Sequence, residues 1–196
     1  MKKIAIFASG SGTNAENIVE YLREKQIAVP AMILSNNPKA KVLQRAERLQ
    51  VPYTVFTRKD FYETDHVLNN LLDHQIDLIV LAGFLWLIPE KIIRAFPNRI
   101  INIHPALLPK YGGKGMYGDK VHRAVIENGE KESGISIHYV NEKYDEGQII
   151  FQSRCPVEKD DTPESLAAKV HALEYKYYPE VVEKLLNSKL QKTNHK

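Results

Sequence analysis

The sequence predicts an α/β fold with a doubly wound, Rossmann-like and mostly parallel sheet that ends in an antiparallel hairpin toward the C-terminus. Two observations predict the parallel part: short apolar runs alternate with helical patterns from the second residue onward, and most of these runs are apolar throughout. Apolar strands separated by helices form sheets that helices cover on both faces. A third observation, two strand-like runs joined by a short turn from residue 134 onward, predicts the hairpin.

The parallel strands are expected at five runs rich in apolar and β-branched residues: residues 2–8, 31–34, 53–56, 77–82 and 100–103. Apolar residues at helical spacing predict the helices between them, at residues 14–25, 40–49, 64–74 and 89–96. Pro89 is expected at the first position of the last of these helices. Right-handed crossovers would wind the helices onto the two faces of one sheet.

The C-terminal part of the chain departs from this pattern. A helix is predicted at residues 119–128, and residues 134–140 then alternate between apolar and polar. Residues 148–157 follow after a turn, and strands joined this closely pair as an antiparallel hairpin. A final helix is expected to begin at Asp161 or Thr162 and to kink or restart at Pro179.

Composition excludes several classes of protein. The 196 residues are 43% hydrophobic and 26% charged, as in a soluble domain that is large enough to bury its own core. The single cysteine, Cys155, allows no internal disulfide and no Cys/His metal cluster, so no metal is expected. A net charge of +3 suits small anionic ligands, and no interleaving of arginine with aromatic residues suggests a nucleic-acid partner.

The N-terminal apolar run is roughly six residues long, too short for the core of a signal peptide. No run approaches the roughly 18 apolar residues of a membrane span. We therefore expect a cytoplasmic protein with no membrane partner.

The first motif with chemical content is Ser9-Gly10-Ser11-Gly12-Thr13-Asn14, between the first strand and the first helix. Glycines let the backbone approach a ligand, and free N–H groups at a helix N-terminus favour an anion. Gly10, Gly12 and Ala15 also fit the dinucleotide fingerprint G-x-G-x-x-G/A. An NAD site wants an acidic residue near the end of the second strand, where residues 35–37 read Ser-Asn-Asn. A phosphate or mononucleotide site is therefore favoured over NAD, and a plain tight turn is the alternative.

The second motif is Asn102-Ile103-His104-Pro105, at the end of the fifth strand. Residues two apart on a strand share a face, so Asn102 and His104 point together at the carboxyl end of the sheet, where open α/β folds bind ligands. An amide donor beside an imidazole can hold an oxyanion and move a proton. Asp145, in the hairpin turn, reads as a turn former, but a carboxylate near His104 would raise the pKa of the imidazole and keep it a proton donor.

Taken together, these residues resemble the glycinamide ribonucleotide formyltransferase family of purine biosynthesis. The resemblance runs from residue 4 to residue 179, and its most specific parts are NIHPALLP at residues 102–109 and D-x-G at residues 145–147. Further matching stretches are residues 9–14, 81–84, 134–140 and 170–179. The resemblance implies transfer of a formyl group from 10-formyltetrahydrofolate, a co-substrate, to the amine of phosphoribosylglycinamide in IMP biosynthesis.

The resemblance also implies site residues. The catalytic residues would be Asn102, His104 and Asp145. The phosphoribosyl part of the substrate would contact Gly12, Thr13, Asn14 and Glu174. The folate would contact Leu85, Trp86, Leu87, Ile88, Asn102 and Asn141. Its anionic tail would face a basic residue, Arg58 or Lys59, of which Lys59 is the one assigned.

One segment departs from the family pattern: residues 111–118 are longer and richer in glycine, and form either a mobile lid or a longer connection. His122 and His138 also match the family and are interpreted as supporting or structural residues. The alternatives in function are a formyltransferase for a sugar nucleotide or another amine, and a non-catalytic nucleotide-binding module. Methionyl-tRNA formyltransferases and formyltetrahydrofolate hydrolases carry added domains that are not expected here.

The expected organisation is a single formyltransferase domain at residues 1–188. Residues 1–100 would form a phosphate- and nucleotide-binding half, and residues 101–188 a catalytic and folate-binding half. Residues 189–196 would be a flexible tail. The partners would be small-molecule substrates, and the protein a monomer or a weak homodimer.

Overall fold

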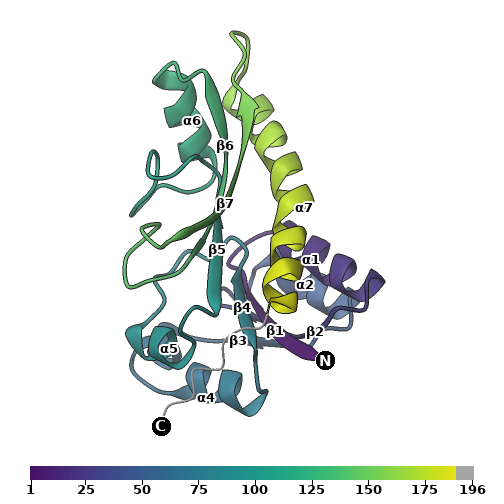
Figure 1. Cartoon of the computed structure of the whole chain (residues 1–196). Coiled ribbons are helices and arrows are strands. Elements are labelled where there is room, and N and C mark those ends of the chain that lie inside the picture. The colour runs from purple at the N-terminus through teal and green to yellow at the C-terminus, as the bar shows by residue number, and fades with distance from the viewer. Residues whose placement is uncertain (189–196) are drawn as a thin grey trace.

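The computed structural model describes residues 1–188, so the expected flexible tail at residues 189–196 lies outside the described residues. Seven strands form one sheet: β1 (Lys2–Phe7), β2 (Ala28–Ser35), β3 (Tyr53–Val55), β4 (Leu78–Leu81), β5 (Ile100–His104), β6 (Glu132–Tyr139) and β7 (Ile149–Pro156). Their spatial order is β3-β2-β1-β4-β5-β6-β7 (Figure 1). All pairs up to β4–β5 are parallel, whereas β5–β6 and β6–β7 are antiparallel. The predicted sheet is confirmed.

Helices cover both faces of this sheet. One face carries α1 (Thr13–Glu24), α2 (Lys41–Arg48), α6 (Asp119–Glu127) and α7 (Pro163–Asn187). The other carries α3 (Arg58–Tyr62), α4 (His66–Asp73) and α5 (Glu90–Ala95). In Figure 1, α1, α2 and α7 lie on one side of the strands, and α4 and α5 lie on the other. Among residues 1–188, no helix is long and apolar enough to cross a membrane.

Strand β1 shows how the sequence builds two cores. Ile4 and Ile6 are fully buried in the cluster beneath α1 and α7, while Ala5 and Phe7 are fully buried in the cluster beneath α3, α4 and α5. Successive side chains on a strand point to opposite faces, so an apolar run without alternation needs cover on both.

Two local expectations need correction. Pro89 is the residue before α5, which begins at Glu90, because its extended backbone (ψ 146°) lies outside the helical region. The final helix does not restart at Pro179, since α7 is one helix of 25 residues with Pro179 inside it. Pro179 and the neighbouring Tyr178 and Val182 are buried against the sheet, and this packing offsets the hydrogen bond that proline cannot donate.

The sequence pattern did not predict α3. It has only five residues and one buried side chain, Phe61, so no helical period is visible. A capping box starts it: Thr57 Oγ1 accepts from the Asp60 N–H, and the Asp60 carboxylate accepts from the Thr57 N–H.

The strand order places the site. After β3 the chain returns to the middle of the sheet, where β4 pairs with β1. The chain continues from β1 toward β2 and β3 on one side of this pair, and from β4 toward β5 on the other side. The carboxyl ends of β1, β4 and β5 meet along one edge, where open α/β sheets bind ligands. The Tyr178 hydroxyl of α7 donates to the Leu81 carbonyl at 2.8 Å and ties the helix to this edge.

Candidate active site

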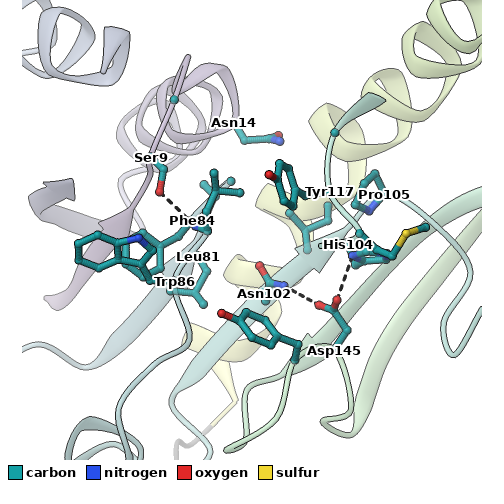
Figure 2. A pocket seen from close by; sticks show the side chains of 18 of the residues that line it. Ser9, Asn14, Leu81, Phe84, Trp86, Asn102, His104, Pro105, Tyr117 and Asp145 are labelled. Carbon is teal, nitrogen blue, oxygen red and sulfur yellow. Dashed lines mark hydrogen bonds and ion pairs between the residues drawn. The ribbon is translucent and has the colours of Figure 1, made fainter. Parts of the chain in front are cut away.

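A cavity of about 620 Å³ opens along that edge of the sheet. Its walls come from the ends of β1, β4 and β5 and the segments that follow them, from the glycine-rich segment and the start of α6, from β6 and the turn after it, and from α7. The lining residues are 9–14, 81–88, 102–105, 113–119, 122, 138, 140, 143–145, 171 and 174. Figure 2 shows Asn102 and His104 converging on Asp145, with Asn14 across the cavity. Within residues 1–188, no group of His, Cys, Asp or Glu side chains is arranged to hold a metal ion.

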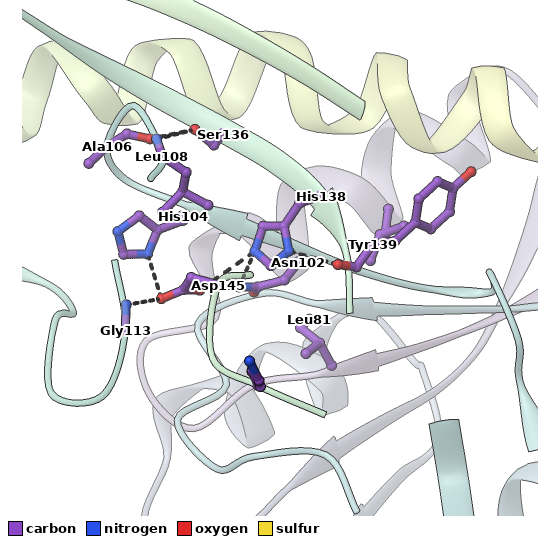
Figure 3. Close-up of polar contacts among 12 residues, drawn as sticks. Leu81, Asn102, His104, Ala106, Leu108, Gly113, Ser136, His138, Tyr139 and Asp145 are labelled. Carbon is purple, nitrogen blue, oxygen red and sulfur yellow. Dashed lines mark hydrogen bonds and ion pairs between the residues drawn. The ribbon is translucent and has the colours of Figure 1, made fainter. Parts of the chain in front are cut away.

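Asp145 is the centre of a polar cluster at one end of the cavity. Its Oδ2 lies 3.5 Å from His104 Nδ1 and accepts a hydrogen bond from the Gly113 N–H at 3.0 Å. Its Oδ1 lies 3.5 Å from His138 Nε2 and accepts from Asn102 Nδ2 at 3.4 Å. Figure 3 shows the carboxylate between these two pairs of partners. The structure thus brings the three residues predicted as catalytic together, with His138 added.

The cluster is almost completely buried: the side chains of His104, His138 and Asp145 are 4%, 3% and 10% exposed to solvent. Burial lowers the pKa of His104, and this effect outweighs the nearby Asp145 carboxylate, which raises it. Burial alone would raise the pKa of Asp145, but hydrogen bonding to His138, the proximity of His104 and the Gly113 N–H together lower it. Asp145 therefore raises the pKa of His104, as expected, but burial of the ring opposes this effect and is the larger of the two. That Asp145 keeps His104 charged stays a prediction.

The second nitrogen of His104 identifies the tautomer. Nε2 lies 2.7 Å from the Tyr111 carbonyl oxygen, which can only accept, so Nε2 carries a proton. Nδ1 faces the Asp145 carboxylate, which is also an acceptor. A proton taken up at Nδ1 would be held between the ring and the carboxylate.

The segment at residues 111–118 touches this cluster through its backbone, at the Tyr111 carbonyl and the Gly113 N–H. Gly112 fits between them because a Cβ there would lie 2.5 Å from Leu108 Cδ2 and 3.3 Å from Asp145 Cβ. Since residues 113–118 line the cavity, this segment is a wall of the site. Whether it moves as a lid stays a prediction.

The glycine motif forms the opposite end of the cavity. Gly12 precedes α1 with φ +74°, a left-handed conformation that favours glycine. Among the described residues, no partner accepts a hydrogen bond from the backbone N–H groups of residues 10–14. Five successive free N–H groups at a helix N-terminus suit an anion such as phosphate.

Beside this loop, buried polar groups extend from α1 to α7. Glu174 is 4% exposed, and its Oε2 accepts from Asn14 Nδ2 and faces His171 Nδ1, both at 2.9 Å. This hydrogen bond raises the pKa of His171, whereas burial lowers the pKa of His122. Asn14 Oδ1 and His122 Nδ1 are buried without a hydrogen-bond partner among the described residues.

The folate residues predicted after β4 line the cavity as a group: Leu85, Trp86, Leu87 and Ile88. Ser9 Oγ accepts from the Leu85 N–H at 3.1 Å and so links this segment to the glycine motif (Figure 2). Lys59 and Asn141 are absent from the cavity wall, and Asn141 Oδ1 accepts from the Lys143 N–H in a local turn. Arg58 is not part of the wall either, but its guanidinium lies 5.7 Å from the ring of Trp86, which is.

These buried histidines give a prediction about stability. The pKa values of His104 and His122 lie below the ordinary 6.5, so the folded protein favours their neutral forms. The unfolded chain takes up more protons as the pH falls through that value, so this stabilisation is present above pH 6.5 and lost below it. We expect the free energy of unfolding, measured in urea, to be lower at pH 5 than at pH 7. His171, with a raised pKa and a half-exposed ring, opposes this only weakly.

The matched control is His122→Asn, which removes one titrating ring. The loss of unfolding free energy between pH 7 and pH 5 should be smaller in this variant than in the parent chain. An unchanged loss would mean that other groups cause it.

Comparison with known proteins agrees with this geometry. A model of the formyl transferase family matches residues 2–182. The chain belongs to the formyl transferase family. The phosphoribosylglycinamide formyltransferase of Bacillus subtilis is 39% identical over 191 residues, which cover 95% of each chain. The chloroplastic enzyme of the same name from Arabidopsis thaliana is 43% identical, and the match covers 92% of this chain and 64% of the plant protein.

Among solved structures, the phosphoribosylglycinamide formyltransferase of Anaplasma phagocytophilum superposes with a TM-score of 0.87 at 34% identity, covering 96% of this chain and 88% of that one. A glycinamide ribonucleotide transformylase of Geobacillus kaustophilus superposes with a TM-score of 0.86 at 37% identity, covering 95% of this chain and 99% of that one. The family and the fold predicted from the sequence are confirmed.

Two features of the site were missed. His171 lies three residues before Glu174 on a predicted helix, and that spacing could have identified it. The backbone groups of Tyr111 and Gly113 left no signal, because the sequence does not show which carbonyl or N–H faces a side chain.

Proposed function

We propose that the chain transfers the formyl group of 10-formyltetrahydrofolate to the amine of phosphoribosylglycinamide, giving the N-formyl product and tetrahydrofolate in de novo purine biosynthesis. The observation that carries the proposal is one cavity with two chemically distinct ends: free N–H groups at residues 10–14, and Asp145 beside Asn102 and His104. Relatives that share family and length with this chain bear the name of this activity.

The phosphoribosyl end is supported by Gly12, Thr13 and Asn14, whose N–H groups suit the phosphate. Glu174 suits the ribose hydroxyls, because a buried carboxylate accepts hydrogen bonds from hydroxyl groups. The other wall, residues 85–88, mixes apolar side chains with backbone polar groups and suits a flat heterocycle such as the folate.

The reaction makes one C–N bond and breaks another. The amine nitrogen attacks the formyl carbon, and the π electrons of the carbonyl move to its oxygen. Collapse of this intermediate breaks the bond to N10 of the folate. The attacking nitrogen loses one proton and N10 gains one. Holding the two substrates together contributes to the rate, by as much as about 7–11 kcal/mol in favourable cases.

Each catalytic residue has a role in these steps. Within residues 1–188, Asn102 Nδ2 lies 3.4 Å from Asp145 Oδ1 and 3.2 Å from His138 Nε2, both at or beyond the upper end of the usual range, so a developing oxyanion can compete for its N–H groups. His104 takes up a proton as negative charge forms beside it, and the ionised Asp145 holds the ring once it is charged. Asp145, through water, carries the proton from the amine toward N10.

The proposal is tested with the purified chain, phosphoribosylglycinamide and 10-formyltetrahydrofolate. We expect release of tetrahydrofolate that depends on both substrates. In a thermal-shift experiment the ribonucleotide should raise the melting temperature by mass action, whereas NAD and NADP should not, because no acidic side chain follows β2 at residues 35–37. A shift with NAD and none with the ribonucleotide would point to an oxidoreductase.

We propose Arg58 in place of Lys59 as the residue that meets the anionic tail of the folate. Its guanidinium lies over Tyr62 at 4.9 Å and over Trp86 at 5.7 Å, so a positive charge sits next to one side chain of the cavity wall. Arg58→Ala should raise KM for the folate by about fivefold to tenfold, a typical loss for one charge-assisted hydrogen bond. Lys59→Ala is the control and should leave KM unchanged. Equal effects of the two variants would contradict this assignment.

Further expectations from the sequence stay proposals. We propose that residues 1–100 supply mainly the phosphoribosyl contacts and residues 101–188 mainly the catalytic ones, in a monomer or weak homodimer. Sedimentation at several protein concentrations would test the assembly. A cytoplasmic location likewise remains a prediction.

A further inference from the structure

We propose that Arg45 is a positioning residue for the phosphate-binding loop, defined here as residues 9–14. Arg45 lies on α2, behind the loop and away from the cavity wall. Its Nε–H donates to the Ser11 carbonyl oxygen at 2.8 Å. The inference rests on the proposed function, because it assigns the loop to the phosphate of the substrate.

Four successive carbonyl groups of the loop are held by hydrogen bonds. Those of Ser9, Gly10 and Gly12 accept from Asn37 Nδ2 at 3.3 Å, the Val42 N–H at 3.1 Å and the Glu16 N–H at 2.9 Å. The Ser11 carbonyl, between them, accepts from Arg45. A trans peptide points its C=O and the next N–H in opposite directions. Holding the Ser11 carbonyl toward α2 therefore turns the Gly12 N–H away from α2.

Arg45 differs from the other partners because its bond comes from a charged side chain, and such bonds are stronger than neutral ones. It also pairs with Glu16, in the first turn of α1. Arg48 pairs with the other oxygen of the same carboxylate. Two arginines thus neutralise one glutamate close to the anion site, but only Arg45 touches the loop.

This arrangement supplies a matched pair of variants. Arg45→Met removes one of the two positive charges that pair with Glu16, and it also removes the hydrogen-bond donor to the Ser11 carbonyl. Arg48→Met removes the other positive charge and leaves that donor in place. Comparing them separates orientation of the loop from local charge.

The readout is the Michaelis constant for each substrate separately. We expect Arg45→Met to raise KM for phosphoribosylglycinamide about tenfold, as for loss of a hydrogen bond to a charged group, and to leave KM for the folate unchanged. Arg48→Met should change either constant by about twofold at most, as for an exposed surface residue. Inorganic phosphate should act as a competitive inhibitor against the ribonucleotide. Its inhibition constant should rise about tenfold in Arg45→Met and change little in Arg48→Met.

Three results would overturn the inference: equal effects of the two variants, an equal rise of both Michaelis constants with Arg45→Met, or no effect of Arg45→Met. If Arg45→Met does not fold, Arg45→Ala, which also removes the donor to the Ser11 carbonyl, takes its place and should show the same selective rise. If the parent chain binds no ribonucleotide, the proposed function is refuted. If the parent chain binds it and Arg45→Met binds it equally well, only the role of Arg45 is refuted.

Discussion

Asp145→Asn is expected to lower kcat by about 10²-fold or more, the usual loss for a group that moves a proton in the rate-limiting step. The carboxylate raises the pKa of His104 against the effect of burial, so its removal lowers that pKa further and disfavours the protonated ring. Folding should survive, because residue 145 has φ +56°, in the left-handed region that asparagine tolerates as well as aspartate. Melting temperature and steady-state kinetics on the same preparation would measure both effects.

The companion variants test whether Asp145 and His104 act as one unit. His104→Ala should cost about as much as Asp145→Asn, and the double variant little more than either single one, because groups that share one step are not additive. Losses that multiply would show that the two residues act independently. An Asp145→Asn variant with nearly full activity would reduce Asp145 to a turn residue.

Gly12→Ala is expected to lower the melting temperature by roughly 5–15 °C, as overpacking and a left-handed backbone together cost about 2–4 kcal/mol in a domain of this size. A Cβ at this position would lie 2.4 Å from Val42 Cγ2 and 2.8 Å from Val42 Cα, and φ is +74°. The methyl group would thus strike α2, and α1 and α2 would have to separate. This geometry adds a second reason for glycine at position 12 to the sequence-based one, which is close approach of the backbone to a ligand.

Gly10→Ala is the matched control for Gly12→Ala. No atom lies within 4 Å of a Cβ at position 10, so the melting temperature should fall by no more than about 2–4 °C, the shift for 1 kcal/mol. Gly10 lines the cavity, so the added methyl group can still obstruct the ribonucleotide and raise its KM. Equal melting temperatures for the two variants would mean that the α1–α2 contact is looser than the structure has it.

The sequence by itself determined the fold class, most element positions, and the residues around Asp145. Periodicity was sufficient for the elements because burial on two faces leaves β1 apolar throughout and α1 apolar along one stripe. The sequence did not predict α3, because a single buried side chain gives no helical period. The expected restart of the final helix at Pro179 was wrong, because the burial of Pro179 within α7 cannot be read from the sequence. Asn102 and His104 were expected on one face because both lie on β5 with period two.

Only the tertiary structure decided what surrounds those residues. The effect of burial on the pKa of His104 depends on segments distant in the chain, and the proposal of Arg58 in place of Lys59 rests on its position over Trp86. Gly12 is required for packing against α2, thirty residues further on. A sequence states which groups a chain carries, whereas charge state, orientation and steric limits are set by neighbours that only folding assembles.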